Sequence, residues 1–157
     1  MELNDDNFDN IVLKRRSEMW LVMFYAPWCG HCKHLKPIFD EAASKAKQYG
    51  MRMGKMDATA SEVIAPRYEV KGYPTLIYYR NNEPHKYKAS RTAEGFVEFA
   101  RVMKQPAVTM LAARHMLDKL VQDRPVVYFL AQPGVEEPQK TELFAAFQRA
   151  AESKQDQ

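Results

Sequence analysis

Two cysteines, Cys29 and Cys32, are separated by only two residues and are the only cysteines among the 157 residues of the chain. Gly30 and His31 lie between them, and Trp28 comes directly before. A thiolate is the attacking group in thiol–disulfide exchange. At this spacing one sulfur can form a mixed disulfide and the other can resolve it. The pair therefore predicts redox chemistry.

The residues on either side predict a strand before the pair and a helix after it. Residues 19–26 are almost wholly apolar and rich in aromatic and branched side chains, as in a buried strand. In residues 35–46 apolar side chains recur at helical spacing, and Gly50 is a typical helix stop. This order places Cys29 at a helix N-terminus, where unpaired N–H groups and the helix dipole favour an anion.

The expected positions assign different roles to the two sulfurs. We expect Cys29 to attack because it is the first cysteine and lies on the solvent side. Cys32, one turn into the helix and more buried, is expected to resolve the mixed disulfide. His31 lies between them and is expected to stabilise the Cys29 thiolate, which makes the disulfide form more oxidising.

Two other interpretations of the cysteine pair compete with redox activity. The cysteines could be half of a zinc site completed by His31 or His34, but zinc frameworks need a second ligand pair, and His85 and His115 stand alone. The pair could instead be a structural disulfide, yet so short a loop constrains the unfolded chain little. Both interpretations are weaker than redox activity, and no metal or cofactor is predicted.

The stretch around the cysteines resembles the active site of a known family. Phe24-Tyr25-Ala26-Pro27-Trp28-Cys29-Gly30-His31-Cys32-Lys33 is similar to the active-site stretch of the protein disulfide isomerase family, which has the thioredoxin fold. Further matches follow in order: Gly-Lys-Met-Asp-Ala-Thr at 54–59, Val-Lys-Gly-Tyr-Pro-Thr at 70–75, and Arg91-Thr92. The run at 54–59 most resembles the thioredoxin-related transmembrane branch of the family.

The resemblance implies an α/β fold, with a central mixed sheet flanked by helices, over residues 1–105. It implies a thiol–disulfide oxidoreductase and isomerase that forms, reduces and rearranges disulfides in partly folded, cysteine-containing secretory proteins. Glutathione or a partner oxidase would be the redox partner, and the endoplasmic reticulum lumen the compartment. The alternative is a chaperone-like, client-binding module with weak redox turnover.

The resemblance also assigns roles to residues outside the Cys29-Gly30-His31-Cys32 motif. Pro74 is implied to be a cis-proline facing the cysteines, and Tyr73 and Trp28 to line the peptide site with it. Arg91 matches a mobile arginine that modulates the pKa of the second cysteine. The alternative for Arg91 is a solvated loop residue.

One position departs from the family. The relatives carry a buried acid that relays a proton to or from the second cysteine, and Met23 stands in its place. Lys55 occupies the paired basic position, and burying an amine without a carboxylate is costly. Lys55 is therefore expected either to reorient to solvent or to serve as a neutral base. We expect the attack by Cys32 to be slower than in acid-containing relatives.

The remaining pattern predicts the other elements of the first domain. The apolar and turn residues predict a short helix after Asn4–Asn7, a strand at 51–57, a helix capped at 58–61 that runs through Tyr68, a strand at 75–79, a turn at 81–84, an edge strand at 85–88 and a helix at 92–104.

Residues 106–157 predict the first half of a second, redox-inactive thioredoxin-like unit. The expected elements are a strand at 108–111, a helix at 112–121, a strand at 126–130 and a helix at 141–151, with Gln132-Pro133-Gly134 where the first domain has its cysteines. A half-sheet exposes an apolar strand. Two explanations stay open: the half docks on another chain, as in a domain-swapped dimer, or the domain continues beyond the sequence.

Composition narrows the partners. A net charge of +3, with no basic cluster among aromatic residues, argues against nucleic acid. No segment is long enough to span a membrane, and neither a signal nor a retention sequence is recognisable. We therefore expect no membrane contact from this part of the protein, although the resemblance allows a membrane-anchored longer form.

Overall fold

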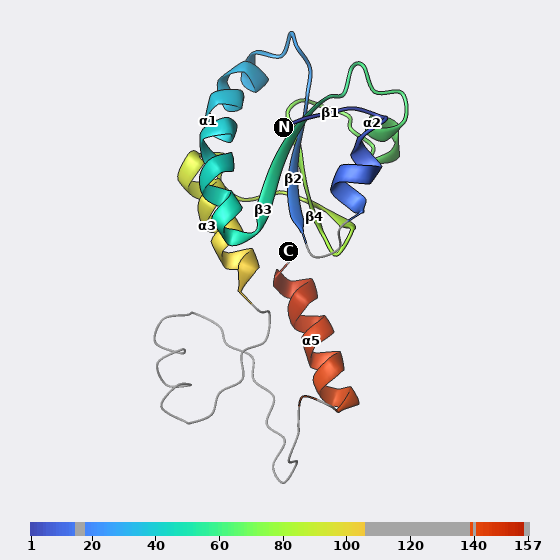
Figure 1. Cartoon of the computed structure of the whole chain (residues 1–157), viewed down its shortest axis with the longest axis vertical. Coiled ribbons are helices and arrows are strands. Elements are labelled where there is room, and N and C mark those ends of the chain that lie inside the picture. The colour runs from blue at the N-terminus through green and yellow to red at the C-terminus, as the bar shows by residue number, and fades with distance from the viewer. Residues whose placement is uncertain (15–17, 106–138, 140, 156–157) are drawn as a thin grey trace. The chain divides into compact units, whose positions relative to one another are not determined.

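The computed structural model describes residues 1–14, 18–105, 139 and 141–155 (Figure 1). The chain divides into two compact units, Met1–Lys104 and Gln105–Gln157. Each is described by itself below.

The first unit is built on a five-stranded mixed sheet with the strand order β1-β3-β2-β4-β5. β1 and β2 run parallel to β3, whereas β4 runs antiparallel to β2 and β5 antiparallel to β4. The strands are β1 Glu2–Leu3, β2 Met19–Tyr25, β3 Met51–Asp57, β4 Thr75–Arg80 and β5 Glu83–Lys86. This arrangement is the thioredoxin-like fold expected from the resemblance, with β1 as an additional strand that the sequence pattern did not predict.

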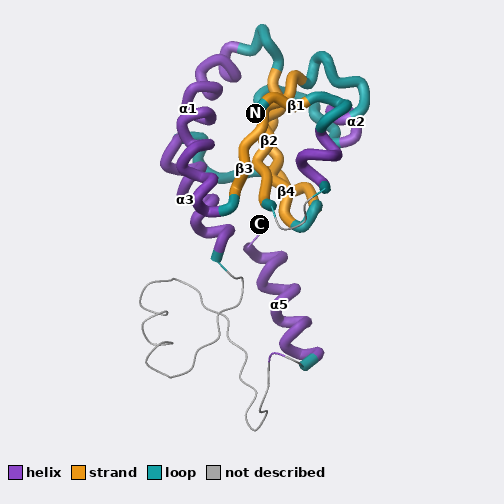
Figure 2. Tube along the Cα trace, viewed as in Figure 1, coloured by secondary structure: helices purple, strands orange, loops and turns teal. Residues whose placement is uncertain are grey.

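Helices cover both faces of the sheet (Figures 1 and 2). α1 (Gly30–Ala46) and α3 (Ala93–Lys104) lie on one face, and the short α2 (Ile64–Arg67) and the π-helical turn η1 (Asp9–Leu13) lie on the other. β2 divides its side chains between two cores, since neighbouring residues of a strand point to opposite faces. Leu21 and Met23 pack on the α1 side, whereas Trp20 and Val22 pack on the α2 side.

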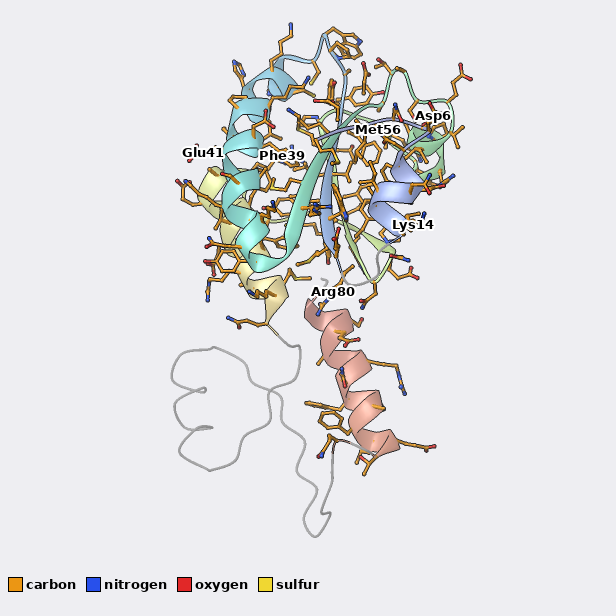
Figure 3. All side chains as sticks on the ribbon, in the orientation of Figure 1. Asp6, Lys14, Phe39, Glu41, Met56 and Arg80 are labelled. Atoms are coloured by element: carbon orange, nitrogen blue, oxygen red, sulfur yellow. The ribbon has the colours of Figure 1, made fainter. Side chains whose placement is uncertain are left out.

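Side chains fill both layers between the sheet and the helices (Figure 3). Phe39 reaches from α1 toward the sheet and is buried against Phe96 of α3, with ring centroids 5.5 Å apart. Glu41 lies on the outer, solvent-exposed side of α1. The apolar residues that recur at helical spacing in 35–46 therefore pack α1 against the sheet, as the sequence predicts.

α1 begins and ends close to where the sequence predicts. Cys29 is its N-cap residue, and the helix continues from Ala46 into the 3₁₀ turn η2 (Lys47–Tyr49). Gly50 then ends it in the left-handed conformation, with φ at 80°, and its N–H donates to the Lys47 carbonyl oxygen at 3.0 Å. Pro37 lies inside α1.

The predicted helix from 58–61 through Tyr68 is too long. Only Ile64–Arg67 is helical, because the carboxylate of Asp5 binds the segment before it. The backbone N–H groups of Glu62, Val63 and Ile64 donate to Asp5 at 2.8–3.1 Å. Hydrogen bonding from the Ser61 hydroxyl, followed by these backbone donors, holds the pKa of Asp5 below its usual value.

The predicted edge strand begins two residues too late. β5 pairs with β4 from Arg80 opposite Glu83, so Asn81 and Asn82 alone form the turn. Both asparagines have positive φ, 53° and 70°, the geometry of a two-residue hairpin. Pro84 is therefore part of the edge strand, where its missing N–H is tolerated.

In the second unit, α5 (Glu142–Gln155) confirms the helix expected at 141–151. Thr141 caps it by accepting from the Phe144 N–H at 3.1 Å. The other elements predicted for this unit, at 108–111, 112–121 and 126–130, and the Gln132-Pro133-Gly134 turn, lie outside the described residues.

Candidate active site

Cys29 lies in the short connection between β2 and α1, directly before the first residue of α1, and its sulfur caps the helix. The Sγ accepts a hydrogen bond from the Cys32 backbone N–H at 3.2 Å. The thiol in turn lies 3.7 Å from the Tyr73 carbonyl oxygen, to which it donates. Both cysteines are free thiols. The sulfur of Cys29 is therefore held by one backbone donor that suits a thiolate and one backbone acceptor that suits a thiol.

Cys32 is one turn deeper and fully buried, with 0% of its surface exposed against 8% for Cys29. Burial, and then the hydrogen bond with Cys29, raise the pKa of the Cys32 thiol, while the Ala26 backbone and the charge of Lys36 oppose that rise. A buried thiol that resists ionisation is a poor attacking group at neutral pH. The expected order, Cys29 outside and Cys32 inside, is confirmed.

The surroundings of the pair come from β2 and from the loop before β4. Ala26 is buried with the two cysteines, and Tyr25 and Tyr73 pack against this cluster. The Tyr73–Pro74 peptide bond is cis, as the resemblance implied. Trp28 is 71% exposed, and its ring meets that of Tyr73 edge to face at 5.8 Å. An aromatic pair beside Cys29, with one ring exposed and the other half-buried, suits an extended apolar segment.

A groove of about 390 Å³ lies beside the cysteines. His31, His34, Leu35 and Ile38 line it from α1, and Tyr73, Pro74 and Arg91 line it from the loops opposite. The structure thus brings four predicted site residues, His31, Tyr73, Pro74 and Arg91, to one groove. Sequence reasoning missed His34, Leu35 and Ile38 as groove residues, although their spacing of three, four and seven residues from His31 marks one helix face.

Two motif residues keep the approach to the pair open. Gly30 is the first residue of α1, and a Cβ built there would meet nothing within 4 Å. His31 is exposed and lies on the groove wall. The positive charge of Lys36 lowers the pKa of Cys32. Arg91 instead lowers the pKa of Tyr87, which burial raises to about 12.

Met23 lies beneath this site with no exposed surface. It belongs to the core on the α1 side, together with Leu35 and Phe39. Lys55 pairs with Met23 in the register of β3 against β2. The position that holds a buried acid in the resembling family is therefore ordinary core in this chain.

Lys55 finds carboxylates elsewhere. Its Nζ lies 2.8 Å from Asp40 of α1 and 3.5 Å from Glu2 of β1, and 13% of its side chain is exposed. Desolvation acts to lower the pKa of Lys55, but hydrogen bonding and charge from Asp40, with Glu2, raise it overall. A raised pKa argues against the neutral base weighed from the sequence. Lys55 instead turns to two partly exposed carboxylates and stays an ammonium.

Within the described residues, no three His, Cys, Asp or Glu side chains are gathered so that they could hold a metal ion. In the same part of the chain, no helix combines the length and the apolar character needed to cross a membrane.

The chain is similar to known proteins in sequence and in structure. A family model described as Thioredoxin matches residues 1–102. Protein disulfide-isomerase TMX3 of Mus musculus is 37% identical over 147 residues, which cover 92% of this chain and 31% of that protein. The protein disulfide-isomerase A6 homolog of Drosophila melanogaster is 42% identical over 105 residues, 64% of this chain and 24% of that protein.

Solved structures show the same relationship. The first thioredoxin domain of mouse protein disulfide-isomerase A4 superposes with a TM-score of 0.60 and 38% identity, covering 71% of this chain and 79% of that one. The zinc-bound form of human ERp44 gives a TM-score of 0.65 at 27% identity, over 76% of this chain and 35% of that one. The chain spans less than a third of the length of the curated relatives above. It belongs to the thioredoxin family, and its relatives there are protein disulfide isomerases.

Proposed function

We propose that this chain is the catalytic part of a thiol–disulfide oxidoreductase that forms, reduces and rearranges disulfides in partly folded secretory proteins. The carrying observation is the Cys29 sulfur, which caps α1, accepts from the Cys32 N–H at 3.2 Å and donates to the carbonyl oxygen of Tyr73, a residue that lines the groove. That geometry presents one sulfur to a client and keeps the second within reach of the first. Relatives named protein disulfide isomerases support the same chemistry.

In the reducing direction, the Cys29 thiolate attacks one sulfur of a client disulfide. A Cys29–client bond forms, the client disulfide breaks, and the second client sulfur leaves as a thiolate that takes up a proton. Cys32 then attacks Cys29, the Cys29–Cys32 bond forms, and the first client sulfur leaves. Two electrons pass to the client, and the reverse sequence donates a disulfide. Isomerisation uses the first step and its reversal at another client sulfur.

The site favours an extended client segment. Trp28 and Tyr73 offer aromatic surface, and Pro74 and Arg91 line the groove together with Tyr73. Glutathione or a partner oxidase would restore the starting redox state. The compartment that goes with such clients is the endoplasmic reticulum lumen, and no cofactor is needed because the two sulfurs carry the electrons.

A second candidate is a client-binding module with weak redox turnover. The observation that favours it is Met23, which leaves the resolving cysteine without a buried acid. The double variant Cys29→Ser with Cys32→Ser separates the two. In oxidative refolding of a reduced, multi-disulfide client, an enzyme loses its activity when both sulfurs are removed. A binding module without the two sulfurs still suppresses client aggregation at the wild-type level.

The equilibrium between the Cys29–Cys32 disulfide and its dithiol, measured in a glutathione series, tests whether the domain mainly donates disulfides or mainly reduces them. Isomerases have potentials of about −180 mV, and thioredoxin has about −270 mV. We expect a value close to that of the isomerases, because His31 lies on the exposed side of the pair. A value as negative as that of thioredoxin would instead assign the domain to reduction.

A further inference from the structure

Lys36 lies one helical turn beyond Cys32 on α1, on the same side of the helix. The residue is half-buried, and its Nζ lies 3.4 Å from the centroid of the Tyr25 ring. Tyr25 itself packs against the cluster of Ala26 and the two cysteines. A cation over the face of an aromatic ring is attracted by the ring quadrupole. Tyr25 therefore holds a positive charge close to the buried sulfur.

Tyr25 is itself held firmly. It ends β2, and its carbonyl oxygen accepts from the Ala58 N–H at 2.9 Å. Its hydroxyl lies 3.4 Å from a Glu2 carboxylate oxygen, to which it donates. Burial, and then the negative charges of Glu2 and Asp57, raise the pKa of the Tyr25 phenol, so the ring stays neutral. The ring is thus a fixed platform for the Lys36 ammonium.

Within the described residues, the other groups near Cys32 differ from Lys36 in charge, pairing or position, which leaves Lys36 well placed to act on this sulfur. From α1, Cys29 raises the pKa of Cys32, and Lys36 lowers it. From β2, Met23 contributes only apolar surface, and Tyr25 is neutral. From β3, Lys55 is bound to Asp40 and Glu2. His31 and Arg91 lie on the groove wall, on the client side.

We propose that Lys36, seated on the Tyr25 ring, favours the Cys32 thiolate and so accelerates the step in which Cys32 resolves the mixed disulfide. This inference rests on the proposed function. In that step Cys32 gives its proton to solvent, and its sulfur attacks Cys29. The Cys29–client bond breaks, and the client sulfur leaves as a thiolate that solvent protonates. Lys36 keeps its proton throughout, and Tyr25 acts as a positioning residue.

The test compares Lys36→Gln with Lys36→Arg, which keeps the charge. Lys33→Gln is the matched control, since Lys33 is an exposed lysine on the same helix. A client peptide is coupled to Cys29 as a mixed disulfide at low pH, where the Cys32 thiol stays protonated. The release of the peptide is then followed after a jump to each of a series of higher pH values. Alkylation of Cys32 with iodoacetamide in the Cys29→Ser background gives a second readout.

In Lys36→Gln we expect release at pH 7 to slow about threefold, because a smaller fraction of Cys32 is thiolate once the positive charge is removed. The pH profiles of release and alkylation should move upward together, and the release rates should converge with those of the wild type at high pH. Lys36→Arg restores the wild-type profile, and Lys33→Gln leaves it unchanged.

Three results would overturn the inference: release in Lys36→Gln at the wild-type rate, slowing by the same factor at every pH, or an equal effect in Lys33→Gln. In each of them the wild-type protein still exchanges disulfides, so the proposed function stands. A wild-type pair that never forms or releases the mixed disulfide removes both.

Discussion

Cys29 and Cys32 share one helical turn but lie in opposite environments. Cys29 caps α1 and has a backbone donor and a backbone acceptor on its sulfur, the acceptor being the carbonyl oxygen of Tyr73 on the groove wall. Cys32 is fully buried in a cluster with Ala26, and Met23 fills the position of the family's buried acid in the core on the α1 side. A three-residue step along the chain thus separates a cysteine that keeps 8% of its surface exposed from one that is fully enclosed.

This difference assigns the two half-reactions to different physical terms. In the proposed reaction, access and backbone polarity control the first attack, because Cys29 is the less buried of the two sulfurs. Desolvation controls the second attack, because the buried Cys32 thiol resists losing its proton. The resolving step therefore depends on whatever charge the protein places next to Cys32.

The largest expected effect comes from removing either sulfur. Cys29→Ser should lower the rate of exchange by about a thousandfold or more, since the attacking group is lost. Cys32→Ser should leave the first attack intact and accumulate the mixed disulfide. Both outcomes can be measured by trapping a fluorescent client peptide on non-reducing gels. Equal losses of mixed disulfide in the two variants would contradict the asymmetry.

Placing an acid at Met23 should bring proton transfer to the buried sulfur. In Met23→Glu we expect release of a mixed disulfide to accelerate about tenfold, a modest share of what a positioned base can supply. Burying the carboxyl should also cost about 1–3 kcal/mol of folding free energy. Met23→Leu is the control, because it keeps the apolar volume. Stopped-flow release at an unchanged rate in Met23→Glu would show that the missing acid does not limit resolution.

The burial of Cys32 also predicts how stability depends on pH. Its folded-state pKa is raised above the unfolded value of about 8.5, so its contribution to stability is complete below that pH and is lost as pH rises through the folded pKa. Relative to Cys32→Ala, the reduced protein should lose up to about 1.4 kcal/mol per pH unit in this range. Urea unfolding between pH 8 and 10.5 measures the difference, and parallel curves for the two proteins would contradict it.

The smallest effect is expected on the client side of the pair. Trp28→Ala should weaken the binding of an extended peptide about fivefold, the loss expected from one aromatic contact. Folding stability should stay within about 0.5 kcal/mol of the wild type, because most of the ring is exposed. Competition with an unlabelled cysteine-free peptide measures the binding. Undiminished binding in Trp28→Ala would move the client site away from Trp28 and Tyr73.

Local signals predicted much of the site. The apolar run before Cys29, the helical spacing after Cys32 and the glycine at position 50 each act through neighbouring residues, and the structure confirms the elements they predict. The cis peptide at Pro74 came from the resemblance, whose motif extends over the flanking residues.

Two of the errors involve contacts between segments distant in the chain. The shortened α2 depends on Asp5, which lies more than fifty residues earlier. The partners of Lys55 depend on how α1 and β1 pack beside β3. Helix propensity and register within one segment carry no information on such contacts. The groove residues His34 and Ile38 were missed for a different reason, since their helix face gains a function only from the loop opposite.

The chain has two tryptophans, and the fold places them in opposite surroundings. Trp20 is almost fully buried on the α2 side of the sheet, whereas Trp28 stands exposed next to Cys29. Indole emission shifts to the red when the ring meets water, so the two contribute separable bands. The Trp28 band responds to a client that covers it and to a change in the neighbouring sulfur, while the Trp20 band reports global unfolding. The protein carries its own fluorescence probe and an internal reference.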